Sequence, residues 1–129
     1  MKHLKNYNIF ESTIITDDNL QDLEDILVEV YDMGYDVNIL ELDSKYHICI
    51  KGDEKISNTP WQQAPNWDQL KEYVSRVKEY LTDVIGVGNK ISLYVNGYAK
   101  SFDSEFVVGK DIPVYSISIY FTAKRQYSW

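Results

Sequence analysis

The sequence predicts an α+β fold, a two-layer sandwich in which two helices cover one face of an antiparallel sheet. Two segments show the apolar spacing of amphipathic helices, and each precedes runs in which apolar and polar residues alternate as in strands. Turn signals such as Asn96-Gly97 join these runs into hairpins, which pair antiparallel strands and make a β-α-β crossover unnecessary. The expected order is therefore α-β-β-α-β-β-β, with Tyr7–Ile15 as a further edge strand before the first helix.

The first helix is expected over residues 17–33. Thr16 is a good N-cap, and Gly34 supplies the left-handed residue that ends the helix. The apolar side chains recur at helical spacing and form one buried stripe. Its members are Leu20, Leu23, Leu27, Val30 and Tyr31.

A hairpin is expected next, built from strands at Tyr35–Leu42 and Tyr46–Lys51. The second strand alternates, with Tyr46, Ile48 and Ile50 on one face and His47 and Cys49 on the other. The first strand has apolar residues on both faces, Val37 and Ile39 on one and Leu40 and Leu42 on the other. This pattern predicts a strand that is buried on both sides or that contains a bulge.

After a loop over Gly52–Pro65, a second helix is expected to begin at Asn66, which forms a capping-box pattern with Gln69. Gly86 and Gly88 end it. Its predicted buried stripe consists of Leu70, Tyr73, Val74, Val77, Leu81 and Val84.

The remainder is expected to be β-structure. Ile91–Val95 alternates up to the Asn96-Gly97 turn, and Tyr98–Phe102 returns from it. Ser104–Val108 either continues this hairpin or forms another short strand. Residues 115–123 alternate regularly, which predicts a strand with one face buried.

Composition excludes several classes of protein. A length of 129 residues supports one domain over residues 1–129, and 44% hydrophobic residues indicate a globular chain. No apolar run approaches the roughly 18 residues of a membrane span, and no signal peptide is evident. A single cysteine excludes an internal disulfide and a cysteine-rich zinc site. We therefore expect a cytoplasmic protein with no membrane partner.

No motif predicts catalysis, a metal or a cofactor. The glycines at 86 and 88 follow a helix, whereas a phosphate loop precedes one. His47 and Cys49 are two residues apart on a strand, about 6.5–7 Å, which is too far for a thiolate–imidazole pair. Histidine spacing does not fit a zinc site, and no calcium loop occurs. The sequence therefore predicts a protein that is not an enzyme.

Negative charge is concentrated in one part of the chain. Between Asn6 and Ser44 there are 11 acidic residues and no lysine or arginine, although the whole chain has 20 acidic and 13 basic residues. On the first helix the carboxylates recur every third or fourth residue and form an acidic stripe. This stripe consists of Asp18, Asp22, Asp25, Glu29 and Asp32. It is either a solvated face that maintains solubility or a docking surface for a basic partner.

Aromatic residues form a second candidate surface. Tyr94 and Tyr120 are expected on the face of the sheet that points away from the helices, and Trp61 is either a cap on the core or an exposed loop anchor. A stacking platform for single-stranded nucleic acid needs a basic groove, which the sequence does not indicate. A protein partner fits these aromatic residues better.

The sequence thus predicts a non-enzymatic protein that acts through contacts with a protein partner, either itself or a basic protein, and not with nucleic acid directly. Lysine outnumbers arginine 11 to 2 and isoleucine reaches 13, which indicates AT-rich coding. With the small size, this favours a phage or viral accessory protein or virion assembly subunit, located in the host cytoplasm or the virion. The alternative is an inhibitor that mimics nucleic acid and docks its acidic helix onto a basic site.

Overall fold

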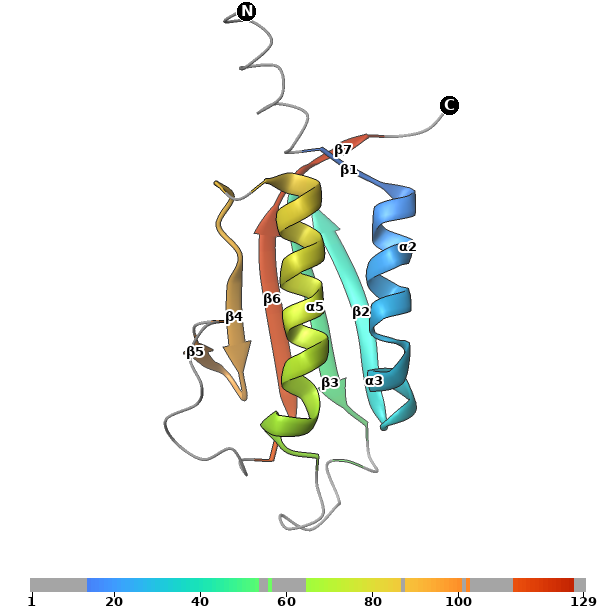
Figure 1. Ribbon diagram of the computed structural model, residues 1–129, viewed down its shortest axis with the longest axis vertical. Helices are drawn as coiled ribbons and strands as arrows, with labels where there is room; N and C mark the ends of the chain where they lie inside the picture. Colours follow the sequence, from blue (N-terminus) through green and yellow to red (C-terminus); the bar gives the residue numbers. More distant parts are fainter. Residues whose placement is uncertain are drawn as a thin grey trace, which may run out of the picture.

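The computed structural model describes residues 14–53, 56, 65–86, 88–100, 102 and 113–126. Figure 1 shows the helices side by side in front of the sheet, so the predicted α+β fold is confirmed. Of the edge strand predicted at Tyr7–Ile15, only Ile14 and Ile15 are described, and both lie in β1; the predicted strand at Ser104–Val108 lies outside the described residues. The elements are β1 (Ile14–Thr16), α2 (Asp17–Ile26), α3 (Val28–Asp32), β2 (Tyr35–Leu42), β3 (Lys45–Gly52), α5 (Trp67–Ile85), β4 (Ser92–Val95), β5 (Tyr98–Lys100), β6 (Ser116–Thr122) and β7 (Lys124–Gln126).

The main sheet has five strands in the order β2-β3-β6-β4-β5, and each neighbouring pair is antiparallel. Because β3 and β4 both run antiparallel to β6, they point in the same direction, and α5 connects them. This is a split β-α-β unit. The expectation that no crossover was needed is therefore wrong, since the last strand of the sheet enters between the two hairpins.

A second, two-stranded sheet joins the two ends of the described chain. β1 pairs with β7 in parallel, with Ile15 opposite Arg125. The Arg125 guanidinium forms ion pairs with Asp17 and, at 3.0 Å, with Glu41. Antiparallel pairing throughout was expected, and β1–β7 is the exception. The two strands lie together at one end of the molecule in Figure 1.

The first helical segment is interrupted at Leu27, whereas the sequence predicted one continuous helix. Leu27 has φ −95° and ψ 5°, and its amide donates to both Leu23 and Glu24. Thr16 caps the helix as predicted, and Gly34 ends it with φ +109°. The predicted stripe is buried except at its ends: Leu20 is half-buried, and Tyr31 is exposed. Tyr31 lies about 100° around the helix from its buried neighbour Val30, which turns its ring to solvent.

Helix α5 begins as predicted with a capping box between Asn66 and Gln69, and Gly86 follows its last residue. Tyr73 and Val84 were placed in the buried stripe, but both lie at its margins and are half-buried. The buried residues are Trp67, Leu70, Val74, Val77, Leu81 and Ile85.

Strand β2 is a regular edge strand, which corrects the expectation that it is bulged or buried on both faces. All eight residues pair with β3 without an interruption, and no strand in the described part of the chain lies on the other side of β2. Val37 and Ile39 pack against the core, whereas Leu40 and Leu42 on the opposite face are 55% and 73% exposed. One face of β2 therefore packs against the core, and the apolar residues on its other face are exposed to solvent.

Tyr35, at the start of β2, is hydrogen-bonded to the segment that immediately precedes β6. Its hydroxyl donates to the backbone carbonyl of Val114 at 2.5 Å, and its side chain is 1% exposed. Burial raises the pKa of Tyr35 to about 12. The folded state therefore holds the neutral phenol more strongly than the unfolded chain, whose tyrosines titrate near 10.

The contribution of Tyr35 to stability is expected to be fully present below pH 10 and to be lost between pH 10 and about 12. Replacing Tyr35 by phenylalanine should cost about 1–2 kcal/mol at neutral pH, because the Val114 carbonyl loses its buried donor. The difference in unfolding free energy between wild type and Tyr35→Phe should then shrink as the pH rises past 10. Urea unfolding at several pH values measures it, and a constant difference would contradict this account.

Candidate functional site

The face of the sheet opposite the helices is the largest candidate surface. Residues on β3, β4 and β6 alternate between core positions and this open face, and no described element covers it. Tyr94, Tyr120, His47 and Cys49 lie here as expected. The open face consists of Asp36, Asn38, Leu40 and Leu42 on β2, Lys45, His47, Cys49 and Lys51 on β3, Ser116, Ser118, Tyr120 and Thr122 on β6, Ser92 and Tyr94 on β4, Ala99 on β5, and Lys90, which precedes β4 and borders the face.

Three rings form an aromatic cluster at the centre of the open face. His47 stacks on Tyr120 with ring centroids 4.3 Å apart and an interplanar angle of 16°. Tyr94 meets Tyr120 edge-on at 5.6 Å. Tyr94 and Tyr120 are 37% and 42% exposed, so a partner that packs on them gains aromatic contact area.

His47 is held neutral by its surroundings. Its Nε2 atom is buried and has no hydrogen-bond partner among the described residues. Burial lowers the pKa of His47, since the charged imidazolium is harder to solvate there. Within the cluster His47 therefore acts as a flat, uncharged stacking partner for Tyr120 and not as a proton donor at neutral pH.

Leu40 and Leu42 extend the aromatic cluster to the edge of the sheet. Leu40 lies opposite His47 in the β2–β3 register, and Leu42 lies opposite Lys45. These leucines were not predicted as binding residues. The sequence pattern could have revealed them: Leu40 and Leu42 occupy even positions of the strand, whereas the core residues Val37 and Ile39 occupy odd positions, so the leucines lie on the opposite face.

Positive charge gathers on the open face. Lys45 and Lys51 are exposed at opposite ends of β3, and Asp36 is the one carboxylate among the described residues of this face. Lys90 joins Lys45 and Tyr120 in the lining of a depression of about 250 Å³. A neighbouring depression of about 390 Å³ is lined by Ser92, Tyr94, Gly97, Ser118 and Tyr120. Sequence patterns do not reveal this grouping, since the three lysines are far apart along the chain.

The acidic stripe lies on the opposite layer of the molecule, and all five of its residues are exposed. Two of them are bound to α5. Tyr80 donates its hydroxyl to Asp22 at 2.5 Å, and Tyr73 donates to Glu29. These carboxylates therefore also join the two helices.

The same contacts act on the tyrosines. The hydrogen bond to Glu29 raises the pKa of Tyr73. Burial raises the pKa of Tyr80, and the hydrogen bond to Asp22 adds to the effect. Both hydroxyls therefore stay protonated and keep donating at neutral pH.

The other three stripe residues, Asp18, Asp25 and Asp32, pair with no lysine or arginine in the described part of the chain. Asp25 accepts a hydrogen bond from Gln21 at 3.0 Å. Two large apolar side chains, Val28 and Tyr31, are exposed on the same helical segment. We call Asp18, Asp25, Val28, Tyr31 and Asp32 the helical face.

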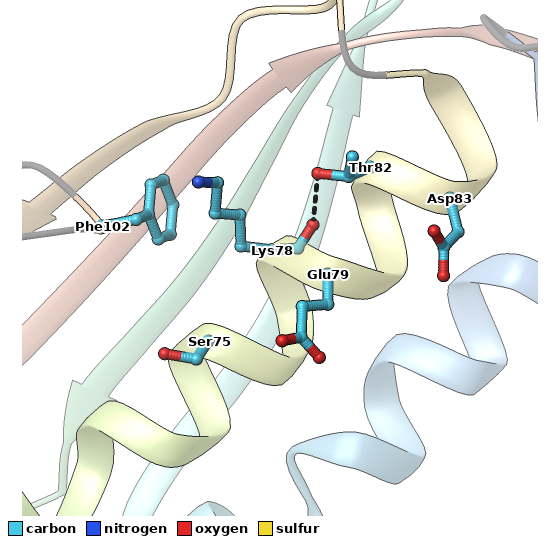
Figure 2. A pocket seen from close by; sticks show the side chains of 6 residues that line it. All are labelled: Ser75, Lys78, Glu79, Thr82, Asp83 and Phe102. Atoms are coloured by element: carbon cyan, nitrogen blue, oxygen red, sulfur yellow. Dashed lines mark hydrogen bonds between the residues drawn. The ribbon is translucent and has the colours of Figure 1, made fainter.

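A hollow of about 460 Å³ lies beside α5. Lys78 extends toward Phe102, with its amine 5.4 Å from the ring centroid, whereas Glu79 and Asp83 point away from that ring (Figure 2). Thr82 donates to the backbone carbonyl of Lys78. These polar groups do not converge on one point, so the hollow offers no evident catalytic arrangement. It is lined by Ser75, Lys78, Glu79, Thr82, Asp83 and Phe102.

Two other kinds of site, a metal site and a membrane-spanning helix, are absent from the described part of the chain. Among residues 14–53, 56, 65–86, 88–100, 102 and 113–126, no group of three or more His, Cys, Asp or Glu could hold a metal ion. No helix in those ranges combines the length and apolar character that crossing a membrane requires. Trp61, the third predicted aromatic contact, lies outside the described residues. Comparison with protein-family models, curated proteins and solved structures finds no match.

Proposed function

We propose that this chain is a non-enzymatic protein-interaction protein that binds a protein partner through the open face of its five-stranded sheet. The observation that carries the proposal is the aromatic cluster, which is partly exposed at the centre of a sheet face that no described element covers. Tyrosine is enriched in the buried part of interfaces, which is also more apolar than the rim around it. Leu40 and Leu42 supply that apolar area at the β2 edge.

The partner is expected to present apolar side chains bordered by carboxylates. The open face carries Lys45, Lys51 and Lys90 against the single carboxylate of Asp36. Such a face attracts an acidic surface and repels a basic one, which sets the choice of partner and the rate of association. We propose that the protein acts in the cytoplasm. If the chain is viral, it acts in the cytoplasm of the host cell or in the virion. The phage or viral origin stays a prediction.

Site-specific photo-crosslinking tests the proposal. A benzophenone side chain at position 94 should form adducts with a protein from the source cell, whereas one at Tyr98 should not. Tyr98 is a matched control because it is 72% exposed and, opposite Val95, lies on the other side of the sheet. The purified partner should bind Tyr120→Ala about tenfold or more weakly and Tyr98→Ala unchanged, by calorimetry. Identical adducts at both positions, or affinity unaffected by Tyr120→Ala, would refute it.

A second candidate is an inhibitor that mimics nucleic acid and docks its acidic stripe onto a basic protein. The favouring observation is that Asp18, Asp25 and Asp32 are exposed and pair with no described cation. In that case Asp→Asn changes at these three positions should abolish partner binding, affinity should fall steeply with salt, and Tyr120→Ala should have no effect. Asp22 and Glu29 are poor choices for this test, because changing them also breaks the contacts with Tyr80 and Tyr73.

A further inference from the structure

We propose that the protein partner is a second copy of this chain, bound head to tail, so that the open face of one molecule packs on the helical face of the next. This inference rests on the proposed function of the open face and names its partner. Two observations support it. The two outer faces of the sandwich are complementary in charge, and each of them exposes large apolar side chains.

Charge is the first line of support. Helices α2 and α3 together carry seven carboxylates and no lysine or arginine. The described residues of the open face, on the other side of the sandwich, include three lysines and one carboxylate. Each molecule therefore has an acidic side and a basic side, although its net charge is −7. Two copies that meet acidic side to basic side attract, whereas copies that meet through like sides repel.

Exposed apolar groups are the second line of support. Val28 and Tyr31 are 50% and 63% exposed on the helical face, beside Asp25 and Asp32 in the sequence. A partner that covers these side chains removes their apolar area from water, which is favourable. On the open face, Leu40, Leu42 and Tyr120 offer matching apolar contacts with Lys45 close by.

The size of the open face agrees with such a contact. The five strands are three to eight residues long, and with a spacing of about 4.8 Å and a rise of about 3.3 Å per residue they span a projected area on the order of 500 Å². Accessible area exceeds projected area because side chains protrude, and a standard interface buries about 800 Å² on each partner. The face is therefore large enough for a specific contact of modest affinity, which depends on protein concentration and on salt.

The geometry of the contact determines the kind of assembly. Since the two faces differ and lie on opposite layers of one molecule, the contact is heterologous. A head-to-tail dimer therefore retains one free open face on one copy and one free helical face on the other. Such contacts build rings or filaments and do not stop at a dimer. This property suits an assembly subunit.

Sedimentation velocity on the full chain, over a range of concentrations at low and high salt, tests the inference. Wild type should form species larger than a dimer at low salt and dissociate at high salt. A sheet-face variant, Lys45→Ala/Tyr120→Ala, and a helical-face variant, Tyr31→Ala/Asp32→Ala, should each remain monomeric. Each variant keeps one working face, so an equimolar mixture of the two should form a one-to-one dimer and nothing larger.

Controls carry the same types of substitution away from both faces. Lys71→Ala/Tyr98→Ala matches the sheet-face variant, Glu79→Ala/Tyr98→Ala matches the helical-face variant, and both should assemble like wild type. Thermal unfolding of every variant shows whether it is folded.

Three results would overturn the inference. They are a wild-type monomer at every concentration and salt, self-association that salt leaves unchanged, and self-association that persists in either face variant. A wild-type monomer that still crosslinks another protein through position 94 would overturn self-assembly and support the proposed function. A monomer that crosslinks nothing there would overturn both.

Discussion

Replacing Gly52 by alanine is expected to destabilise the fold by about 2–4 kcal/mol, because a methyl group at this position has no space. A Cβ atom on Gly52 would lie 2.5 Å from Cγ2 and 2.8 Å from Cβ of Ile56. Neither atom is the flexible end of a side chain, and Ile56 is 3% exposed. The backbone around Ile56 would have to move out, and its side chain would lose part of its burial. Urea unfolding followed by circular dichroism measures the change.

A double-mutant cycle tests the cause of this destabilisation. In an Ile56→Ala background Cγ2 is gone, so Gly52→Ala should cost at least about 1 kcal/mol less than in wild type. Gly97→Ala is an unsuitable control, since Gly97 has φ +87° and its substitution is strained for another reason. Gly88→Ala is the matched control, because a Cβ there meets nothing within 4 Å. Equal costs of Gly52→Ala in both backgrounds would show that the clash with Cγ2 of Ile56 is not the cause.

Asn96→Ala is the second large effect, with an expected cost of about 2–4 kcal/mol. The Asn96 side chain accepts from the backbone amides of Tyr115 and Ser116 at 2.8 and 3.2 Å and donates to the carbonyl of Pro113 at 2.9 Å. Asn96 also has φ +51°, a conformation that costs alanine roughly 1 kcal/mol more than asparagine. Alanine would leave three backbone groups without their partner and strain the turn between β4 and β5.

Asn96→Gly separates the two contributions. Glycine adopts the positive φ without strain but makes none of the side-chain hydrogen bonds. It should therefore recover roughly 1 kcal/mol of the loss and no more. Hydrogen exchange should show faster exchange of the Tyr115 and Ser116 amides in both variants. Full recovery of stability by glycine would mean that the hydrogen bonds contribute little.

The candidate site was predictable only in part. Strict alternation around Ile117 and Ile119 placed Tyr120 on the outer face, and alternation in β4 placed Tyr94 on the same face. The sequence could not reveal the stacking of His47 on Tyr120, because the two are opposite each other only through the β3–β6 register. It also could not show that Tyr73 and Tyr80 bind Glu29 and Asp22 of the acidic stripe, since these contacts join separate helices.

Local chemistry by itself determined the elements of this protein. Caps at Thr16 and Asn66, a positive-φ residue at Gly34 and the Asn96-Gly97 turn act over a few residues, so the sequence reveals them directly. Only the tertiary structure decided the rest, because it depends on pairing between segments that are distant along the chain. Packing inserts β6 between β3 and β4, leaves β2 at the edge, and so exposes Leu40 and Leu42 beside the aromatic cluster. It also gathers Lys45, Lys51 and Lys90 on the layer opposite the acidic stripe, which no local pattern encodes.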